Sequence, residues 1–456
     1  MSTLIHGGTL VTGDGRTLDR GAIVLKSGRI ADVLDRWDPR LGFEGEIIDA
    51  SGCIVMPGLI NCHAHGVTPG PLFPSAAPAL PDHAWLANLD RHLLAGTTTV
   101  LNLCGFATMD EVREANKRHA VRIAGATTHL PSALLAAQKA DGGGLTGREA
   151  HLSVEKMLDD GAVAIGELGG GQTLGGGGQD LVYLPAAIER RTGVRISQAQ
   201  ARRLKEAVLG RFVDAAGTDI EELTRAAADA GLTGHLGTAE LATLVFDTVM
   251  PSVAPAIEGI REGVRAAKRF GVPALVHSAS ATAAVLRELM EDPDVRGASV
   301  IAAHVNHPSH TPDEALDLAA LGRDRGWSGE ASVFDLLHRR HTVTTREHWD
   351  RLLAEPGLVE VLGTDYGHGG EHDELISAVQ DLVAQGHRSL GDAVSMATSA
   401  VVRLIPGIAP QRGELRTGLV ADVVVVEASD FRVVRDVFVE GEQVVRDGEL
   451  TAGARP

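Results

Sequence analysis

Short apolar runs that close on a histidine or a carboxylate constrain the fold of this chain more than any other feature. The run at 53–60 leads into a His-x-His pair, and four later runs each end at one polar residue; the polar residues are His63, His65, Glu167, His277, His304 and Asp365. Each run is followed by a loop and then by a stretch with helical spacing. Alternating strands and helices indicate a parallel sheet, and in a (β/α)8 barrel the reactive groups lie at the carboxyl ends of the strands. The sequence therefore predicts an α/β fold, a TIM-like (β/α)8 barrel.

The chemistry of these six residues points to a metal. His63 and His65 lie two positions apart on an extended segment, so their side chains point to the same side. Taken alone, a His-x-His is weak, because the chain has 19 histidines, and any one of the six could be a capping or buried polar group at a strand end. Together they form a nitrogen and oxygen donor set that suits zinc, iron, manganese or nickel.

The two ends of the chain differ from its middle. Residues 1–56 and 409–456 both read as short strands with tight turns, which predicts a small β-sandwich built from both termini. Residues 57–408 form the predicted barrel. A helical insertion at about 172–250 exceeds an ordinary connection, so we interpret it as a lid or an oligomer contact, with ordinary barrel helices and a surface elaboration as the alternative. Its last helix is expected at 238–249, and a separate helix is expected at 256–270. Glycines at 169–171 and 175–178 predict a pliable segment packed closely beside Glu167, with a disordered linker as the alternative.

Two motifs and the order of the polar residues resemble the amidohydrolase superfamily of metal-dependent hydrolases. The segment 57–65, Pro-Gly-Leu-Ile-Asn-Cys-His-Ala-His, is similar to the first-strand signature of that family, and 418–426 is similar to its C-terminal Gly-x-x-Ala-Asp-hydrophobic strand. The resemblance implies that His63 and His65 bind one metal and that His277 and His304 bind a second. It also implies that Asp365 binds the first metal and acts as general acid and base.

The fourth barrel strand separates subgroups of that superfamily. Hydantoinases, dihydroorotases and ureases use a carboxylated lysine there, whereas this chain has Glu167, and its nearest lysine, Lys156, falls in the preceding helix-like segment. A glutamate can bridge two cations with its two oxygens, which is similar to the enamidase-like branch. Deaminase branches generally use one metal and a glutamate soon after the fifth-strand histidine, but residues 278–281 contain no carboxylate.

These observations predict a binuclear metal-dependent hydrolase that cleaves a C–N bond of a small amide or cyclic amide through a metal-bridging hydroxide. The expected cofactor is two divalent ions, zinc before iron, manganese or nickel. The first alternative is a mononuclear deaminase of a heterocycle, which would need only His63, His65, His277 and Asp365. The second is a non-catalytic scaffold, for which lost ligands would be the sign, and all six candidates are present.

Candidate substrate-binding residues follow the strands. His129 comes after the third strand, and His368 and His372 lie in the loop after Asp365, so each is a candidate to contact substrate. His307 and His310 follow the sixth strand and are interpreted as loop groups that support the ligands.

Composition limits the partners and the compartment. A net charge of −18 disfavours nucleic acid and anionic membrane surfaces, and no 18-residue apolar run was expected, so no membrane span is predicted. Three cysteines and no evident secretory signal are typical of a cytoplasmic protein. The expected partners are a small-molecule substrate and further copies of the chain in a homo-oligomer.

Overall fold

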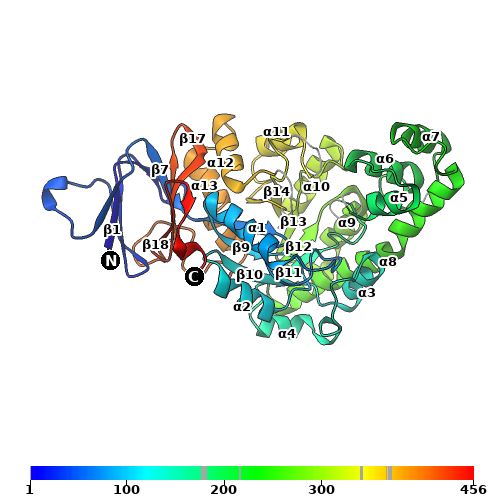
Figure 1. Cartoon of the computed structure of the whole chain (residues 1–456), viewed down its shortest axis with the longest axis horizontal. Coiled ribbons are helices and arrows are strands. Elements are labelled where there is room, and N and C mark those ends of the chain that lie inside the picture. The colour runs from blue at the N-terminus through cyan, green and yellow to red at the C-terminus, as the bar shows by residue number, and fades with distance from the viewer. Residues whose placement is uncertain (1, 176–181, 215–216, 339–342, 366, 368–371) are drawn as a thin grey trace.

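A parallel barrel forms the centre of the molecule. The computed structural model describes residues 2–175, 182–214, 217–338, 343–365, 367 and 372–456 (Figure 1). Within these residues, eight parallel strands pair in sequence order: β8 (Leu59–Ala64), β9 (Thr97–Asn102), β10 (Arg122–Thr127), β11 (Ala164–Leu168), β12 (Ala274–His277), β13 (Val300–Ala303), β14 (Ser328–Ser332) and β15 (Val361–Gly363). The last strand returns to the first, where the amide of Asp365 donates to the carbonyl of His63 at 3.0 Å. The predicted (β/α)8 barrel is confirmed.

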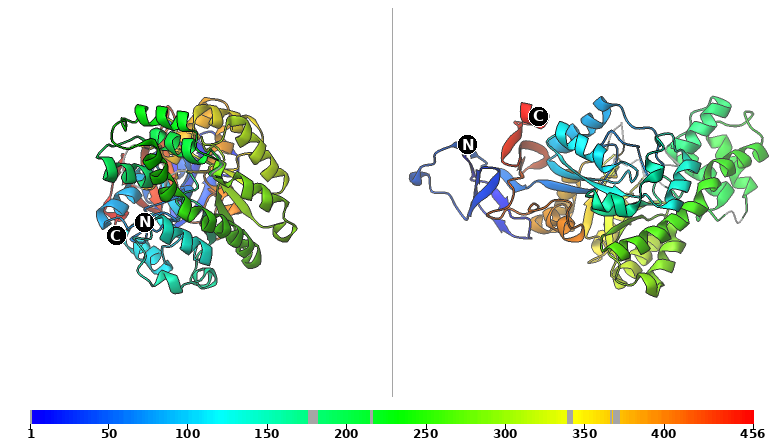
Figure 2. Two further views of the ribbon diagram at one scale, coloured as in Figure 1. Left: turned by 90° about the vertical axis from the view of Figure 1, so that its right-hand side faces the viewer. Right: turned by 90° about the horizontal axis from the view of Figure 1, so that it is seen from below.

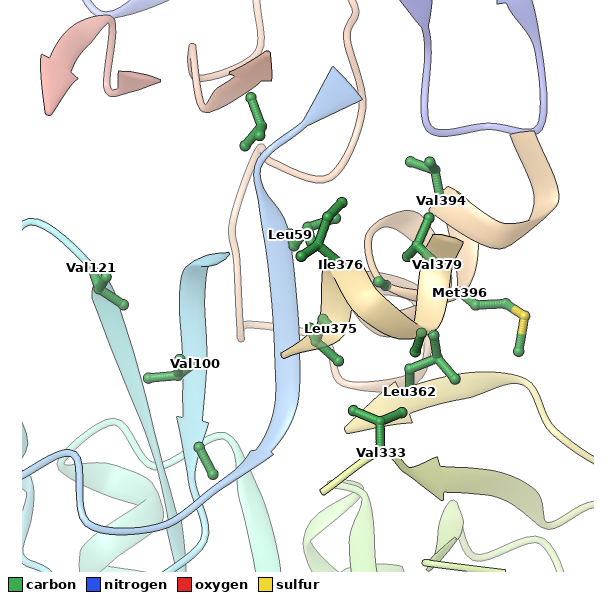
Figure 3. Packing of buried hydrophobic residues seen from close by; sticks show 14 of the residues in the cluster. Leu59, Val100, Val121, Val333, Leu362, Leu375, Ile376, Val379, Val394 and Met396 are labelled. Atoms are coloured by element: carbon green, nitrogen blue, oxygen red, sulfur yellow. The ribbon is translucent and has the colours of Figure 1, made fainter. Parts of the chain in front are cut away.

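Helices connect the strands and cover the barrel. They are α1 (Asp82–Leu94), α2 (Met109–Arg118), α3 (Pro131–Ala140), α4 (Val154–Asp159), α9 (Ala283–Glu291), α10 (Pro312–Asp324), α11 (Arg346–Ala354), α12 (Leu375–Ala384), α13 (Leu390–Met396) and α14 (Ser399–Leu404). Thr108 and Thr311 begin α2 and α10 with capping boxes, because each hydroxyl accepts from the amide of a glutamate three residues later. Figure 3 shows Leu375, Ile376 and Val379 of α12 packed toward Leu59 of β8 and Leu362 of β15.

Both chain termini build the accessory sheets. A seven-stranded sheet joins β2 (Thr9–Val11), β3 (Thr17–Leu18) and β7 (Cys53–Pro57) to β16 (Val423–Glu427), β17 (Asp430–Val439), β18 (Glu442–Arg446) and β19 (Glu449–Leu450). A four-stranded sheet contains β1 (Ser2–His6), β4 (Ala22–Lys26), β5 (Arg29–Leu34) and β6 (Glu46–Asp49). The sheets share one apolar core, in which Ile5 and Ile23 of the smaller sheet cluster with Val55 and Val425 of the larger. We propose 1–56 and 409–456 as one domain and 57–408 as the other.

A group of helices separates β11 from β12. It comprises α5 (Leu184–Thr192), α6 (Gln198–Leu209), α7 (Ile220–Asp229) and the first half of α8 (Thr238–Phe270). This helical insertion lies at the end of the barrel opposite the accessory sheets (Figures 1 and 2). The sequence predicted separate helices at 238–249 and 256–270, but α8 continues through Pro251 and Pro255. The carbonyls that the two prolines leave unpaired belong to the exposed residues Asp247 and Pro251, where water can satisfy them.

Among the described residues, α8 alone is long and apolar enough to cross a membrane by length and composition. Its most apolar 18-residue window has a mean hydropathy of 1.2, and 28% of that window is buried. No membrane span was expected from the sequence, in which polar residues such as Asp247 and Ser252 interrupt the apolar residues of this segment. The buried side of α8 packs on α3, where Gly259 lies against Ala133, and the core helix of a globular protein meets the same criteria.

Candidate metal centre

The barrel brings the six predicted ligands together. Each lies at or just beyond the carboxyl end of its strand: His63 and His65 at β8, Glu167 on β11, His277 on β12, His304 after β13, and Asp365 after β15. Five of the six side chains are nine-tenths or more buried, and the side chain of Asp365 is 14% exposed. The structure therefore gathers the whole predicted set, and Asp365 is the member that solvent reaches most easily.

Glu167 lies between two pairs of histidines. Its Oε1 is 2.8 Å from Nδ1 of His277 and 2.9 Å from Nε2 of His304, and those two nitrogens are 2.8 Å apart. Its Oε2 is 3.7 Å from Nε2 of His63 and 3.6 Å from Nε2 of His65. One carboxylate therefore contacts both pairs, with a different oxygen for each.

Asp365 faces the first of these pairs. Its Oδ1 is 3.3 Å from Nε2 of both His63 and His65, and its Oδ2 is 3.5 Å from Nδ1 of His304. Donors about 2.0–2.1 Å from a tetrahedral ion lie about 3.3–3.4 Å from one another. The nitrogens of His63 and His65 and the facing oxygen of Asp365 are thus spaced as ligands of one ion would be.

The donor chemistry also fits a metal. Nε2 of His63 makes no hydrogen bond among the described residues, although it is fully buried between two carboxylates. Groups that could hold an ion are His63 with His65 and Glu167, and Glu167 with His277 and His304. Buried nitrogen and carboxylate donors that face one another without a full set of protons need a cation at the centre.

Charges within the cluster keep both carboxylates ionised. Burial alone would raise the pKa of Glu167, but hydrogen bonds from His277 and His304 hold it well below its usual value. Burial opposes protonation of His63, yet Asp365 and neighbouring carboxylates raise its pKa to about 10. Without a metal, the first histidine pair therefore holds protons, and a metal must displace them to bind.

Two ligands have left-handed backbones. His304 has φ +41° and Asp365 has φ +52°, a region that residues other than glycine seldom occupy. Hydrogen bonds compensate for this strain: the amide of His304 donates to Glu330 at 2.6 Å and that of Asp365 to the carbonyl of His63. Strained, non-glycine conformations held in this way concentrate at functional sites.

Glu330 is a candidate functional residue that the sequence analysis missed. It lies on β14, is completely buried, and its Oε2 is 3.4 Å from Nδ1 of His63, while its Oε1 accepts from the hydroxyl of Ser332 at 2.9 Å. It also groups with His63 and His304 as a possible metal-holding set. Because His63 presents its other nitrogen to Glu167 and Asp365, we interpret Glu330 as the carboxylate that orients this ring. The sequence feature that could have revealed Glu330 is a glutamate between small residues in the segment 328–332.

Other contacts position the remaining ligands. Nδ1 of His65 lies 3.7 Å from the sulfur of Cys104, and Nδ1 of His304 lies 3.2 Å from the hydroxyl of Ser332. Close to Glu167, a Cβ on Gly170 would lie 1.9 Å from Oε2 of the glutamate, so only glycine fits there. The prediction of a closely packed glycine segment is thus explained for 169–171, whereas 176–178 lie outside the described residues.

A small cavity lies among the ligands. Its volume is about 20 Å³, and it is lined by His65, Phe73, Glu167, Gly171, His277, His304 and Asp365. A space of this size accommodates about one water molecule. The ligand cluster therefore surrounds room for a small reactant.

The three candidate substrate residues lie in different places. His129 is buried on the loop after β10, with Nδ1 2.9 Å from the hydroxyl of Thr127, and burial lowers its pKa to about 4. His372 lies apart from the ligands, where Nε2 is 2.8 Å from Oε1 of Glu374 and the ring stacks on Phe334. His368 is outside the described residues. His129 and His372 do not line the cavity as described.

The structure is also informative about Lys156. The sequence analysis placed Lys156 in a helix-like segment rather than at the end of the fourth strand, and the structure places it in α4. There its Nζ pairs with Asp160 at 2.5 Å, and its side chain is 57% exposed.

Comparison with known proteins defines the family. The model described as "Amidohydrolase family" matches residues 54–444, so the chain belongs to the amidohydrolase family. The predicted superfamily is thereby confirmed.

Curated relatives match only part of the chain. The 5-methylthioadenosine/S-adenosylhomocysteine deaminase of Thermococcus onnurineus is 30% identical over 143 residues, which are 27% of this chain and 32% of that protein. The 5'-deoxyadenosine deaminase of Methanothermobacter thermautotrophicus is 36% identical over 86 residues, 19% of this chain and 18% of that protein. The matched part thus spans a third or less of the length of these relatives.

Solved structures share the fold over nearly the whole chain. β-Aspartyl dipeptidase from Fervidobacterium islandicum AW-1 superposes with a TM-score of 0.55 at 14% identity, covering 99% of this chain and 98% of that one. A D-hydantoinase gives 0.52 at 16% identity, with 99% and 96% covered. At such identities the likeness concerns the fold alone.

Proposed function

We propose that this protein is a binuclear metal-dependent hydrolase that cleaves the C–N bond of a small amide or cyclic amide. The observation that carries the proposal is Glu167, which offers Oε1 to His277 and His304 and Oε2 to His63 and His65. A single metal would leave one of these histidine pairs without a function. Membership of the amidohydrolase family supports hydrolysis of a C–N bond.

The position of each residue in the cluster indicates its role. Divalent ions in such a site lower the pKa of water and polarise a carbonyl oxygen. Asp365 is the most accessible carboxylate of the cluster, and the neighbouring His63 and His304 keep its pKa low despite burial, so it is ionised and able to accept a proton. It takes the proton of the attacking water and delivers it to the leaving nitrogen.

Zinc is the metal we propose, because imidazole and carboxylate donors at these spacings suit it. Iron, manganese or nickel are the alternatives. The glutamate on the fourth barrel strand also supports placing the chain near the enamidase-like branch of the family.

A mononuclear deaminase is the second candidate. The curated relatives are named as deaminases, and they match at 30–39% identity over parts of the chain. Such an enzyme would use His63, His65, His277 and Asp365 and release ammonia. The absence of a carboxylate at 278–281 counts against it.

Metal content separates the two candidates. We would measure metal per chain in protein purified without chelators, together with Glu167→Gln. The matched control is Glu374→Gln, which also removes the charge of a buried carboxylate held by two histidines but lies outside the ligand cluster. The binuclear proposal predicts about two metals in the wild type and the control, and one or none in Glu167→Gln.

Other outcomes have clear meanings. About one metal per chain, unchanged in Glu167→Gln, would favour the deaminase and direct the search to ammonia release from heterocycles. No metal under any loading condition would overturn the metal centre itself. In the hydrolase, Asp365→Asn should abolish turnover of any amide found in a screen, and activity retained in a metal-loaded variant would refute the role of Asp365.

A further inference from the structure

His307 is a buried imidazole beside the ligand cluster that the mechanism above does not use. It lies on the loop after β13 and is completely buried. Its ring centroid is 5.7 Å from that of His277 and 6.0 Å from that of His304. The ring is thus a neighbour of the second histidine pair. His307 does not line the cavity of about 20 Å³ as described, so a substrate would have to extend beyond that cavity to reach it.

The contacts of His307 determine which nitrogen carries its proton. The backbone amide of Ser309 donates to Nδ1 at 3.2 Å, and the hydroxyl of Ser309 lies 2.8 Å from the same nitrogen. That hydroxyl oxygen already accepts from the amide of Ser280 at 3.0 Å, so its hydrogen is directed to His307. Because Nδ1 accepts these bonds, it has no proton, and the neutral ring carries its hydrogen on Nε2.

This Nε2–H donor has no acceptor among the described residues. Nε2 is buried and makes no hydrogen bond there, although buried donors in proteins are nearly always paired. An N–H group in such a position is satisfied when a bound molecule brings an oxygen to it.

The surroundings favour an oxygen with negative charge. Of the charged groups that act on His307, the guanidinium of Arg202 on α6 has the largest effect. Arg211, just beyond α6, donates to the carbonyl of Ser309 at 3.1 Å, and its own carbonyl accepts from the hydroxyl of Ser280 at 2.6 Å. The helical insertion therefore anchors the loop of His307, and Arg202 adds positive potential to it, whereas the charge of Arg211 is paired with Glu314.

We propose that His307 donates its Nε2–H to an anionic oxygen of the substrate, next to the metal-binding histidines. This oxygen is either the oxyanion that develops on the amide carbonyl or a carboxylate of the substrate. The inference rests on the proposed hydrolase function, and it makes His307 a donor for substrate or transition state.

The test uses His307→Phe, which removes the donor, and His307→Gln, which keeps an N–H group. The matched control is His119→Phe, because His119 is a buried histidine at the end of α2 whose Nε2 lies 3.2 Å from Asp90, away from the metal centre. The probe is inorganic phosphate, an oxyanion, titrated by calorimetry into metal-loaded protein. We expect the Kd for phosphate to rise about tenfold in His307→Phe, with His307→Gln and the control within about threefold of the wild type.

Metal content and kinetics complete the test. Metal per chain should be unchanged in all three variants. With an amide from the screen, a fall in kcat at constant KM would identify the oxyanion as the acceptor, and a rise in KM at constant kcat a substrate carboxylate.

Two results would overturn the inference. Unchanged phosphate binding in His307→Phe would show that Nε2 meets no anionic oxygen, and metal loss in that variant would show that His307 only supports the ligands. Either result leaves the metal content of the wild type, and so the proposed function, standing. Absence of metal from the wild type would instead remove the proposed function.

Discussion

Removing the negative charge of Glu330 should weaken metal binding without removing any of the six ligands. The carboxylate is completely buried, accepts from the amide of His304 at 2.6 Å, and lies 3.4 Å from Nδ1 of His63. A carboxylate behind a metal-binding imidazole orients the ring and makes it a better ligand. The charge of Glu330 therefore acts on the metal through His63 and through the strained backbone of His304.

The structure suggests a graded effect of two substitutions. In Glu330→Gln the amide oxygen can still accept from His304 while its NH₂ group faces Ser332, so mainly the charge is lost, and we expect metal affinity to fall about tenfold, or about 1.4 kcal/mol. Glu330→Leu also leaves the amide of His304 without an acceptor and removes the acceptor of the Ser332 hydroxyl, which keeps only its contact with Nδ1 of His304. For this variant we expect about a hundredfold loss of affinity and a lower Tm.

Competition with a chromophoric chelator measures these affinities. Glu360→Gln is the control, because Glu360 directly precedes β15 and accepts hydrogen bonds from Ser328 and Arg403, away from the metal centre. Metal affinity in Glu330→Leu within about threefold of the wild type would refute the reasoning. Removing a residue that hydrogen-bonds a metal ligand usually lowers metal affinity by about tenfold or more.

Three further outcomes follow from the same geometry. In the metal-free protein the pKa of His63 is raised to about 10, and that of His65 is raised well above its usual value by Asp365 and other neighbours despite burial. Metal binding at pH 7 should therefore release about two protons, measured by calorimetry in buffers of different ionisation heat, and release below one proton would contradict these pKa directions. Burial lowers the pKa of His129 to about 4, below its unfolded value of about 6.5, so its contribution to stability is present above pH 6.5 and is lost as the pH falls to 4. In chelator-treated protein, His129→Leu should therefore reduce the loss of stability in acid by up to about 3 kcal/mol, measured by denaturant unfolding. An unchanged pH profile in this variant would count against the prediction. In Gly363→Ala the new Cβ would lie 2.4 Å from Oε1 of Glu330 and 2.6 Å from Cβ of His63, so metal content and Tm should both fall, and normal metal content would show that the site can relax around a methyl group.

The meeting of the six candidate ligands in one place could be predicted because strand ends carry most of the information about a barrel site. The carboxyl ends of parallel strands meet whatever the loops between them do, so apolar runs ending at His277 or His304 were enough to place those side chains. Loop residues lack this constraint. His372 is only seven positions from Asp365, yet its contact with Glu374 at the start of α12 holds it away from the ligands.

Glu330 was missed for a related reason. Its strand, Ser328–Ser332, has the sequence Ser-Gly-Glu-Ala-Ser and shows no apolar run. Neighbouring elements bury this strand although its own side chains are small or polar, so its burial could not be predicted from its sequence. The barrel itself offered a clue, since eight strands require one between Ala303 and Val361. Helix α8 illustrates the opposite error: two separate helices were expected at 238–249 and 256–270, but exposed carbonyls at the prolines between them allow one helix to continue.

The arrangement around the second histidine pair bears most directly on the number of metals. Nδ1 of His277, Nε2 of His304 and Oε1 of Glu167 form a triangle with edges of 2.8–2.9 Å. Burial lowers the pKa of His277, which disfavours a charged ring, while Glu167 stays ionised. Protons alone satisfy this triangle poorly, because each hydrogen bond joins only two of its three atoms. A cation is attracted to all three atoms at once and offsets the carboxylate charge, which supports the proposed second metal. The edges of the triangle are shorter than the spacing of about 3.3–3.4 Å between the ligands of a tetrahedral ion, so the three atoms would move apart to hold one.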